Sequence, residues 1–180
     1  FESMAKRLGW EVTFAKVTQT LTELELIGIL PEFDGWIIGD DPASQKVVKA
    51  GAAGRLRAAV KWGAGTDNID FAAFQDMGIP IDNTPGMFGD EVADVAIGYL
   101  IGISRHLFVV NEGVKSGKWE KPIGTSLRNK TIALVGYGDI GQQIKKRLDV
   151  MGCNVVVYDP YCNSDELIVK EWPDGLGDCA

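Results

Sequence analysis

The chain has 180 residues, of which 46% are hydrophobic and 24% charged, values that are ordinary for a soluble globular protein. Its formal charge of −7 argues against a nucleic-acid partner, because a general phosphate-backbone binder needs a basic face. The longest strongly apolar segment, residues 92–104, is too short to cross a bilayer, so no membrane partner is expected.

Helical and strand-like patterns alternate through the first half of the chain. The expected helices cover residues 1–9, 21–30, 41–51 and 68–78, and the expected strands cover residues 10–16, 33–40, 56–63 and 79–86. The helix over residues 41–51 has Asp41 as its expected N-cap and Gly51 at its exit. Alternation of this kind is typical of an α/β protein, in which helices connect the strands of a parallel sheet.

A long helix and a second alternating unit fill the rest of the chain. The helix over residues 90–110 is apolar almost all round, so both its sides are expected to be covered. A loop-rich connection over residues 111–130 leads to the second unit, whose expected elements are a strand over 131–135, a helix over 140–151 and a strand over 154–158. The polar tail after Tyr158 offers one short helix and no third strand.

These patterns predict two α/β domains, residues 1–85 and residues 86–180, with the long helix as the bridge between them. A doubly wound sheet normally has about five or six strands. The second unit offers two, and the first begins with a helix where a strand usually leads. Both domains are therefore expected to lack pieces.

The sequence between the two strands of the second unit contains a glycine-spaced turn. Gly136, Gly138 and Gly141 form the pattern G-x-G-x-x-G, which is weak alone but here follows a strand and opens a helix. In a dinucleotide site the first glycine permits the tight turn, the second lets the backbone approach a pyrophosphate, and the third lets helix and strand pack closely. The free N–H groups at the helix N-terminus then face the phosphates.

An acidic residue at the end of the next strand completes the pattern. Asp159 follows the first glycine by 23 residues and can accept hydrogen bonds from the ribose hydroxyls of an adenosine. Because a carboxylate there repels a 2′-phosphate, NAD is favoured over NADP. The alternative is a plain βα turn, which we consider weaker because turn, helix and acid coincide. Asp139 lies inside the loop, where its charge is unfavourable beside a pyrophosphate unless its side chain faces solvent.

Four segments together carry a resemblance to a known family. "VKWGAGTDNID" (60–70), "GIPIDNTPGMFGDEVADVAIGYL" (78–100), "TIALVGYGDIG" (131–141) and "VVVYDPY" (155–161) occur in order and at family-like intervals. The chain closely resembles the D-isomer-specific 2-hydroxyacid dehydrogenases, particularly their phosphoglycerate dehydrogenase-like branch. The resemblance covers nearly the whole chain. It implies a flavodoxin-like substrate domain, a Rossmann NAD-binding domain and a homodimer assembled largely through the latter.

The resemblance also implies roles for individual residues. Gly63, Ala64 and Gly65 match the loop whose backbone amides face the carboxylate of a small 2-hydroxy or 2-oxo acid, and consecutive N–H groups in such a turn make an anion-binding concavity. The alternative is a plain turn at a strand end. Asp139 and Ile140 match positions that contact the pyrophosphate through backbone amides. Asp139 departs from the arginine frequent there.

The groups that would transfer protons and grip the substrate are not apparent in the chain. Family members take an arginine, a glutamate and a histidine from beyond the second strand of the NAD domain, whereas the last arginine here is Arg147. The single histidine, His106, lies outside every motif and is interpreted as a structural helix-end residue. Lys61 could help to hold an anion, although a lysine that ends a strand is more often solvated. We therefore expect no catalytic residue and no turnover in this chain.

Two functions remain open on this reasoning, beside a third possibility that the chain does not bind NAD because half of the cofactor pocket is absent. The first is part of an NAD-dependent oxidoreductase that interconverts a D-2-hydroxy acid, such as 3-phosphoglycerate, and its 2-oxo acid. The second is a non-catalytic NAD-binding or interaction module of the same fold. The three cysteines, Cys153, Cys162 and Cys179, show no metal-ligand spacing and suggest free thiols, so no metal site and a cytoplasmic location are expected.

Overall fold

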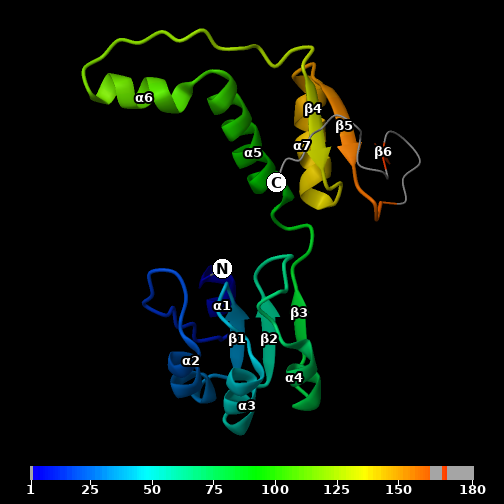
Figure 1. Cartoon of the computed structure of the whole chain (residues 1–180). Helices are drawn as coiled ribbons and strands as arrows, with labels where there is room; N and C mark the ends of the chain where they lie inside the picture. The colour runs from blue at the N-terminus through cyan, green and yellow to red at the C-terminus, as the bar shows by residue number, and fades with distance from the viewer. Residues whose placement is uncertain (1, 163–167, 170–180) are drawn as a thin grey trace. The chain divides into compact units, whose positions relative to one another are not determined.

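A computed structural model of the protein describes residues 2–162 and 168–169. The chain divides into two compact units, Phe1–Thr84 and Pro85–Ala180. Each unit contains one parallel three-stranded sheet with helices between the strands (Figure 1). The α/β class predicted from the alternating pattern is confirmed, and the candidate loops follow the carboxyl ends of strands in both units.

The first unit is built around the sheet β1-β2-β3, in which β2 is central. Its elements are α1 (Glu2–Arg7), α2 (Glu23–Ile29), the 3-10 helix η1 (Leu30–Glu32), β1 (Gly35–Ile38), α3 (Gln45–Ala53), β2 (Ala58–Lys61), α4 (Phe71–Asp76) and β3 (Ile81–Asn83). Ala59 of β2 is in register with Trp36 of β1 and with Ile81 of β3. The loop after β2 therefore leaves the middle of the sheet.

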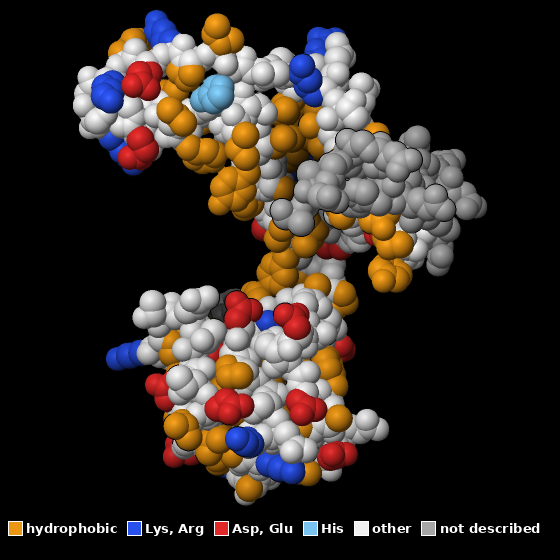
Figure 2. Space-filling view, viewed as in Figure 1, with side chains coloured by type: hydrophobic (Ala, Val, Ile, Leu, Met, Phe, Trp, Pro, Cys, Tyr) orange, Lys and Arg blue, Asp and Glu red, His pale blue; other side chains and the backbone are white. Residues whose placement is uncertain are grey.

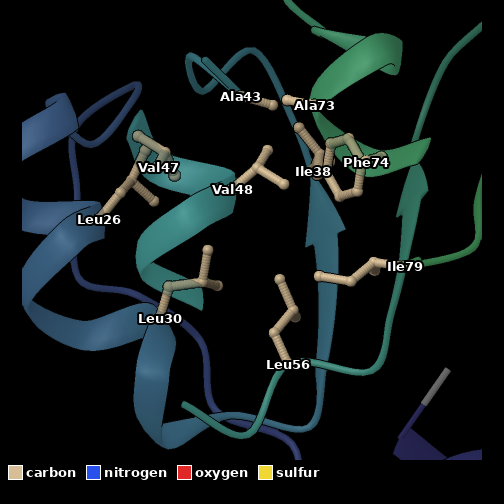
Figure 3. Packing of buried hydrophobic residues seen from close by; sticks show 10 residues of the cluster. All are labelled: Leu26, Leu30, Ile38, Ala43, Val47, Val48, Leu56, Ala73, Phe74 and Ile79. Atoms are coloured by element: carbon tan, nitrogen blue, oxygen red, sulfur yellow. The ribbon is translucent and has the colours of Figure 1, made fainter. Parts of the chain in front are cut away.

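The core of the first unit joins three helices to the sheet. Figure 3 shows side chains from α2, α3 and α4 gathered with those of the strands and their connections. Its members are Leu26, Leu30, Ile38, Ala43, Val47, Val48, Leu56, Ala73, Phe74 and Ile79. Phe74, the largest, has no exposed surface. Burying side chains of this size stabilises a fold by about 1.5–3 kcal/mol each, so this core fixes the ends of β1 and β2 firmly.

Two predictions for the first unit were wrong in detail. Residues 10–16 form no strand, and no described strand pairs with them. Trp10 and Phe14, about two-thirds exposed at 63% and 65%, lie on no buried face. A strand needs a neighbour for its backbone N–H and C=O groups, and alternation alone does not supply one.

The second error concerns the ends of α3. Ser44 occupies the N-cap position, while Asp41 instead accepts a hydrogen bond from the Leu21 N–H at 2.8 Å. The helix continues through Gly51, which is buried against two leucines. A Cβ at Gly51 would lie 2.7 Å from the Leu56 side chain, so this glycine serves close packing and not helix termination.

The second unit is built around the sheet β4-β5-β6. Its elements are α5 (Gly89–Ser104), α6 (Leu107–Lys115), β4 (Thr131–Val135), α7 (Asp139–Val150), β5 (Asn154–Tyr158) and β6 (Ile168–Val169). β4 and β5 match the predicted strands. The two-residue β6 pairs in parallel with β5, so the expectation of no third strand was wrong. The short helix expected in the tail falls largely on residues outside the described ranges.

The predicted long helix is broken into α5 and α6. His106 lies between them with a left-handed backbone, φ 55°, and the two helices are bent by 70°. Residues other than glycine rarely adopt this conformation, so a break at a histidine was not predicted from the sequence. Side chains expected to be covered are exposed, including Tyr99 at 59% and Ile103 at 67%. Among the described residues no single helix could span a membrane, and only the bent α5–α6 pair is long and apolar enough together.

Candidate functional site

The glycine-spaced loop lies between β4 and α7, at the carboxyl end of the sheet in the second unit. Gly136 has φ +90°, a conformation that side chains other than glycine rarely adopt, and its N–H donates to the Tyr158 carbonyl at 2.8 Å. The loop therefore turns sharply as soon as the pairing of β4 with β5 ends. This is the tight turn that the first glycine was predicted to permit.

The other two glycines of the loop lie in opposite surroundings. A Cβ at Gly141 would overlap the carbonyl oxygen of Gly136, so α7 packs directly on the loop backbone at this buried glycine. A Cβ at Gly138 would meet no atom within 4 Å. One glycine thus closes the loop against the helix, while the other leaves its outer side open to a ligand.

The N-terminus of α7 presents unpaired donors at this open side. The first backbone bond of the helix runs from the Gln142 N–H to the Gly138 carbonyl at 3.0 Å. The N–H groups of residues 138–141 donate no hydrogen bond within the described chain. Free N–H groups at a helix N-terminus, with the helix dipole behind them, attract an anion such as a pyrophosphate.

Asp159 lies next to this loop at the end of β5. Its Oδ2 accepts the Tyr137 N–H at 2.7 Å, and its Oδ1 accepts the N–H groups of Tyr161 at 2.8 Å and Cys162 at 3.1 Å. The N–H groups of Tyr137 and then Tyr161 hold the pKa of the Asp159 carboxyl below its usual value, against a smaller opposing effect of burial. Asp159 is thus a charged acceptor, and Oδ2 retains capacity for a further donor.

Asp139 is exposed, as the solvent-facing alternative expected, and its carboxyl group also lies close to another helix. Its carboxyl group lies over Gly89, the first residue of α5, with Cγ 2.7 Å from the place of a Gly89 Cβ. The neighbouring Ile140 is exposed on the first turn of α7. The loop residues and Asp159 therefore come together in one place, with the Asp139 side chain directed to α5.

The loop of Gly63, Ala64 and Gly65 follows the central strand of the first unit. The Gly63 N–H donates to Thr84 Oγ1 at 2.8 Å, so this amide is occupied. The N–H groups of Ala64 and Gly65 donate no hydrogen bond within the described residues, and both residues are exposed. Asn83 Nδ2 donates to the Ala64 carbonyl at 3.0 Å. The loop thus offers two free amides to an anion.

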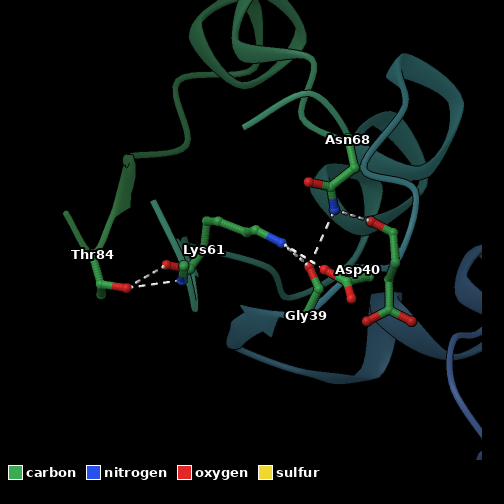
Figure 4. Close-up of polar contacts among 7 residues, drawn as sticks. Gly39, Asp40, Lys61, Asn68 and Thr84 are labelled. Carbon is green, nitrogen blue, oxygen red and sulfur yellow. Dashed lines mark hydrogen bonds and ion pairs between the residues drawn. The ribbon is translucent and has the colours of Figure 1, made fainter. Parts of the chain in front are cut away.

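Lys61 anchors the base of this loop and is not solvated. Its side chain is 6% exposed, and its ammonium group donates to the Gly39 carbonyl and to Asp40 Oδ1, the latter at 3.2 Å (Figure 4). Asn68 Nδ2 donates to the same Gly39 carbonyl at 3.1 Å. Asp40, Lys61 and Asn68 help to line a cavity of about 360 Å³ beside Gly63. The expectation that a strand-end lysine is solvated was wrong here, because a carbonyl and a carboxylate replace water.

Thr84 and Asn68 are contributors that the sequence analysis did not single out. Thr84 directly follows β3 and its hydroxyl accepts the Gly63 N–H, whereas Asn68, ahead of α4, donates to the carbonyls of Gly39 and Asp41. The polar cluster "TDN" directly after the glycines was the available signal. Within residues 2–162 and 168–169 no group of three or more His, Cys, Asp or Glu could hold a metal ion.

His106, which was weighed for catalysis, and Arg147, the last arginine of the chain, both have partners elsewhere. His106 Nε2 lies 3.2 Å from the Ile123 carbonyl, at the corner between α5 and α6. The Arg147 guanidinium contacts Asp90 at 3.1 Å and Asp94 at 2.8 Å on α5, which raise its pKa. Among the described residues, no hydrogen bond or ion pair joins either side chain to the glycine-spaced loop. Their placement fits structural roles.

Comparison with known proteins places this geometry in a family context. The family described as "D-isomer specific 2-hydroxyacid dehydrogenase, NAD binding domain" matches residues 97–174. A hydroxypyruvate reductase from Thermotoga maritima is 34% identical over 85% of this chain and 50% of its own length. A D-3-phosphoglycerate dehydrogenase from Synechocystis is 32% identical over 86% of this chain and 28% of its own length.

A solved structure with bound cofactor is also similar. The 3-phosphoglycerate dehydrogenase of Entamoeba histolytica, crystallised with NAD+, superposes with a TM-score of 0.73 at 28% identity, covering 94% of this chain and 51% of that one. The chain therefore spans about half the length, or less, of these relatives.

Proposed function

Since the chain belongs to the D-isomer-specific 2-hydroxyacid dehydrogenase family, we propose that its second unit binds NAD as part of an oxidoreductase acting on a D-2-hydroxy acid. The observation that carries this proposal is the open loop at Gly138, where the unpaired N–H groups of residues 138–141 lie beside the carboxylate of Asp159. These groups fit the two ends of an adenosine diphosphate, an anion and a ribose diol. NAD, when bound, supplies the hydride acceptor.

In this proposal each group of the loop has a separate task. The N–H groups at the start of α7 hold the pyrophosphate, and the open face of Gly138 lets it approach the backbone. The Asp159 carboxylate accepts hydrogen bonds from the ribose hydroxyls and repels a 2′-phosphate. This selects NAD over NADP. Ile140 contributes its backbone amide.

The first unit is proposed to hold the acidic substrate. The free N–H groups of Ala64 and Gly65 would receive its carboxylate, while Gly63 keeps its own amide bonded to Thr84 and so fixes the loop. A small 2-hydroxy or 2-oxo acid, such as 3-phosphoglycerate, is the substrate class that follows. Lys61 lies directly below this loop and fixes its position through Gly39.

A narrower function is proposed for these 180 residues themselves, which is dinucleotide binding without turnover. The observation that favours it is the placement of His106 and Arg147, both engaged in structural contacts away from the glycine-spaced loop. A proton must move between the substrate hydroxyl and a base for hydride transfer to proceed, whereas both side chains are engaged with partners inside the second unit.

Titration of the purified chain with NADH tests both proposals. We expect saturable binding, seen as a change in NADH fluorescence, with weaker binding of NADPH. We expect no loss of NADH absorbance when hydroxypyruvate is added. Oxidation of NADH by the chain would contradict the narrower proposal, and the absence of any binding would contradict the assignment of the loop.

A second copy of the chain is the proposed protein partner. Val92, Val95, Tyr99 and Ile103 repeat at helical spacing along α5 and form one exposed apolar stripe, which Figure 2 shows among the hydrophobic side chains of this unit. A stripe of this kind can pack on its own copy about a two-fold axis.

Changing Tyr99 to aspartate is expected to convert a dimer into a monomer, because a charge would be buried in an apolar contact. Sedimentation velocity measures the change. Val150→Asp is the matched control, since Val150 is 90% exposed on α7 outside the stripe and its replacement should leave the dimer intact. A wild-type chain that sediments as a monomer would contradict the proposed partner.

A further inference from the structure

Asp139 is the one loop residue whose side chain faces another helix. It is the first residue of α7, and its carboxyl group lies over Gly89, the first residue of α5. A Cβ on Gly89 would overlap the Asp139 carboxylate, so the contact depends on glycine at position 89. The start of α5 and the start of α7 therefore meet at this carboxylate, and α5 packs against α7 (Figure 1).

The start of α5 lacks a side-chain cap of its own. Phe88 occupies the N-cap position and makes no side-chain capping bond, and the first helical bond runs from the Val92 N–H to the Phe88 carbonyl at 3.1 Å. A carboxylate near a helix N-terminus is attracted by the helix dipole. The Asp139 carboxylate is attracted by the dipoles of two helices at once, its own and that of α5.

The same carboxylate is unfavourable for the proposed ligand. The pyrophosphate of a dinucleotide would lie at the N–H groups of residues 138–141, which include the N–H of Asp139 itself. Two negative charges this close repel each other, and the repulsion between exposed charges weakens as salt is added. An arginine at this position would attract the phosphate instead. The chain thus has a local conflict between holding α5 and binding the ligand.

We propose that Asp139 is a positioning residue that holds the start of α5 on the glycine-spaced loop and, in doing so, lowers the affinity of the loop for a dinucleotide. Arg147 holds α7 to α5 further along, through Asp90 and Asp94. Asp139 fixes the N-terminal end of α7, where the dinucleotide is proposed to bind. The part that concerns affinity rests on the NAD binding proposed above, whereas the part that concerns α5 does not.

A double-mutant cycle tests the contact without any ligand. In the wild-type background Gly89→Ala should lower the unfolding midpoint, because the new methyl group displaces the carboxylate. In an Asp139→Ala background the same change should be neutral or stabilising, since alanine is the better helix former. Equal effects of Gly89→Ala in the two backgrounds would overturn the positioning role.

NADH titration of Asp139→Asn tests the effect on affinity. We expect about two- to fivefold tighter binding at low salt, with the gain shrinking as sodium chloride is added. Asp149→Asn is the matched control, because it removes the same charge from the far end of α7, where Asp149 pairs with Lys145 at 2.7 Å. A merely structural role would not produce a salt-dependent gain.

The outcomes separate this inference from the proposed function. Unchanged or weaker NADH binding by Asp139→Asn, with binding by the wild type retained, overturns the affinity cost alone. If neither protein binds NADH, both the proposed function of this chain and the affinity cost are overturned, and the cycle at Gly89 still decides the positioning role. Coupling at Gly89 together with tighter, salt-dependent binding supports the inference in full.

Discussion

Gly141→Ala is expected to lower the free energy of unfolding of the chain by about 1–3 kcal/mol and to abolish NADH binding. The reason is local, because the added Cβ would overlap the carbonyl oxygen of Gly136, which is backbone and cannot rotate away. The start of α7 must then move off the loop, and the unpaired N–H groups move with it. Chemical denaturation and NADH fluorescence measure the two effects.

Gly138→Ala is the matched control, with the same chemical change three residues earlier. Gly138 has φ −70° and ψ −160°, which alanine adopts without strain, and its Cβ would meet no atom within 4 Å. The variant should therefore be as stable as the wild type. Its methyl group would nevertheless occupy the open side of the loop and weaken NADH binding by about tenfold or more.

The pair of variants separates folding from binding. Loss of stability at Gly141 together with loss of affinity alone at Gly138 is the expected pattern. If Gly138→Ala binds NADH as tightly as the wild type, the pyrophosphate does not approach this face and the assignment of the loop fails. If Gly141→Ala is as stable as the wild type, the close packing of α7 on Gly136 does not contribute to the fold.

The parts of the fold that local pattern determines were predicted closely. The strands at 131–135 and 154–158 were placed to the residue, because both are short apolar runs bounded by turn residues and both are paired in the sheet. The strand predicted over residues 10–16 has the same local character but no described partner. Strand formation depends on a neighbour, and a neighbour is not visible in a local pattern.

The break between α5 and α6 could not be predicted for a different reason. Apolar residues continue on both sides of the polar residues 104–106, and nothing in this pattern specifies the left-handed conformation of His106. The conformation is held by long-range contacts, such as that of the His106 ring with the Ile123 carbonyl and that of the Thr125 N–H with the Ser104 carbonyl at 2.8 Å. Residues far along the chain decide where the helix bends.

The candidate site also has features that the sequence predicted and features that it did not. The conformational roles of Gly136 and Gly141 follow from spacing, because a tight turn into a helix has few solutions, and the structure bears out both. The burial of Lys61 and the contact of Asp139 with Gly89 could not be predicted, since each partner comes from another element. Sequence spacing predicts backbone shape well, while it leaves side-chain partners open.

Asp159→Asn is expected to weaken NADH binding by about tenfold or more and to reduce the preference for NADH over NADPH. Hydrogen bonds to a charged acceptor are stronger than those to a neutral amide. The wild-type carboxylate accepts a hydrogen bond from the Tyr137 N–H inside the loop. In the proposed complex it also accepts hydrogen bonds from the ribose. Its replacement therefore disturbs loop and ligand together, and the loss of charge removes the repulsion of a 2′-phosphate.

The acid dependence of stability gives an independent measure of the same carboxylate. The pKa of Asp159 in the folded chain lies below its ordinary value of 3.8, chiefly because the N–H groups of Tyr137 and Tyr161 donate to it. Its stabilising effect is therefore complete above the unfolded pKa of about 3.9 and is lost as the pH falls through the lower, folded value. Asp159→Asn should lose less stability than the wild type over this acid range.

Both measurements can contradict the role assigned to Asp159. Asp149→Asn on α7 is the control, since it removes an equal charge from an exposed pair with Lys145 and should change neither nucleotide preference nor the acid limb of unfolding. If Asp159→Asn still excludes NADPH as strongly as the wild type, the selectivity has another source. If the nucleotide preference shifts while the loss of stability at acid pH is unchanged, the carboxylate recognises the ribose without organising the loop. The reason is that only its hydrogen bonds to the backbone contribute to the stability of the free chain.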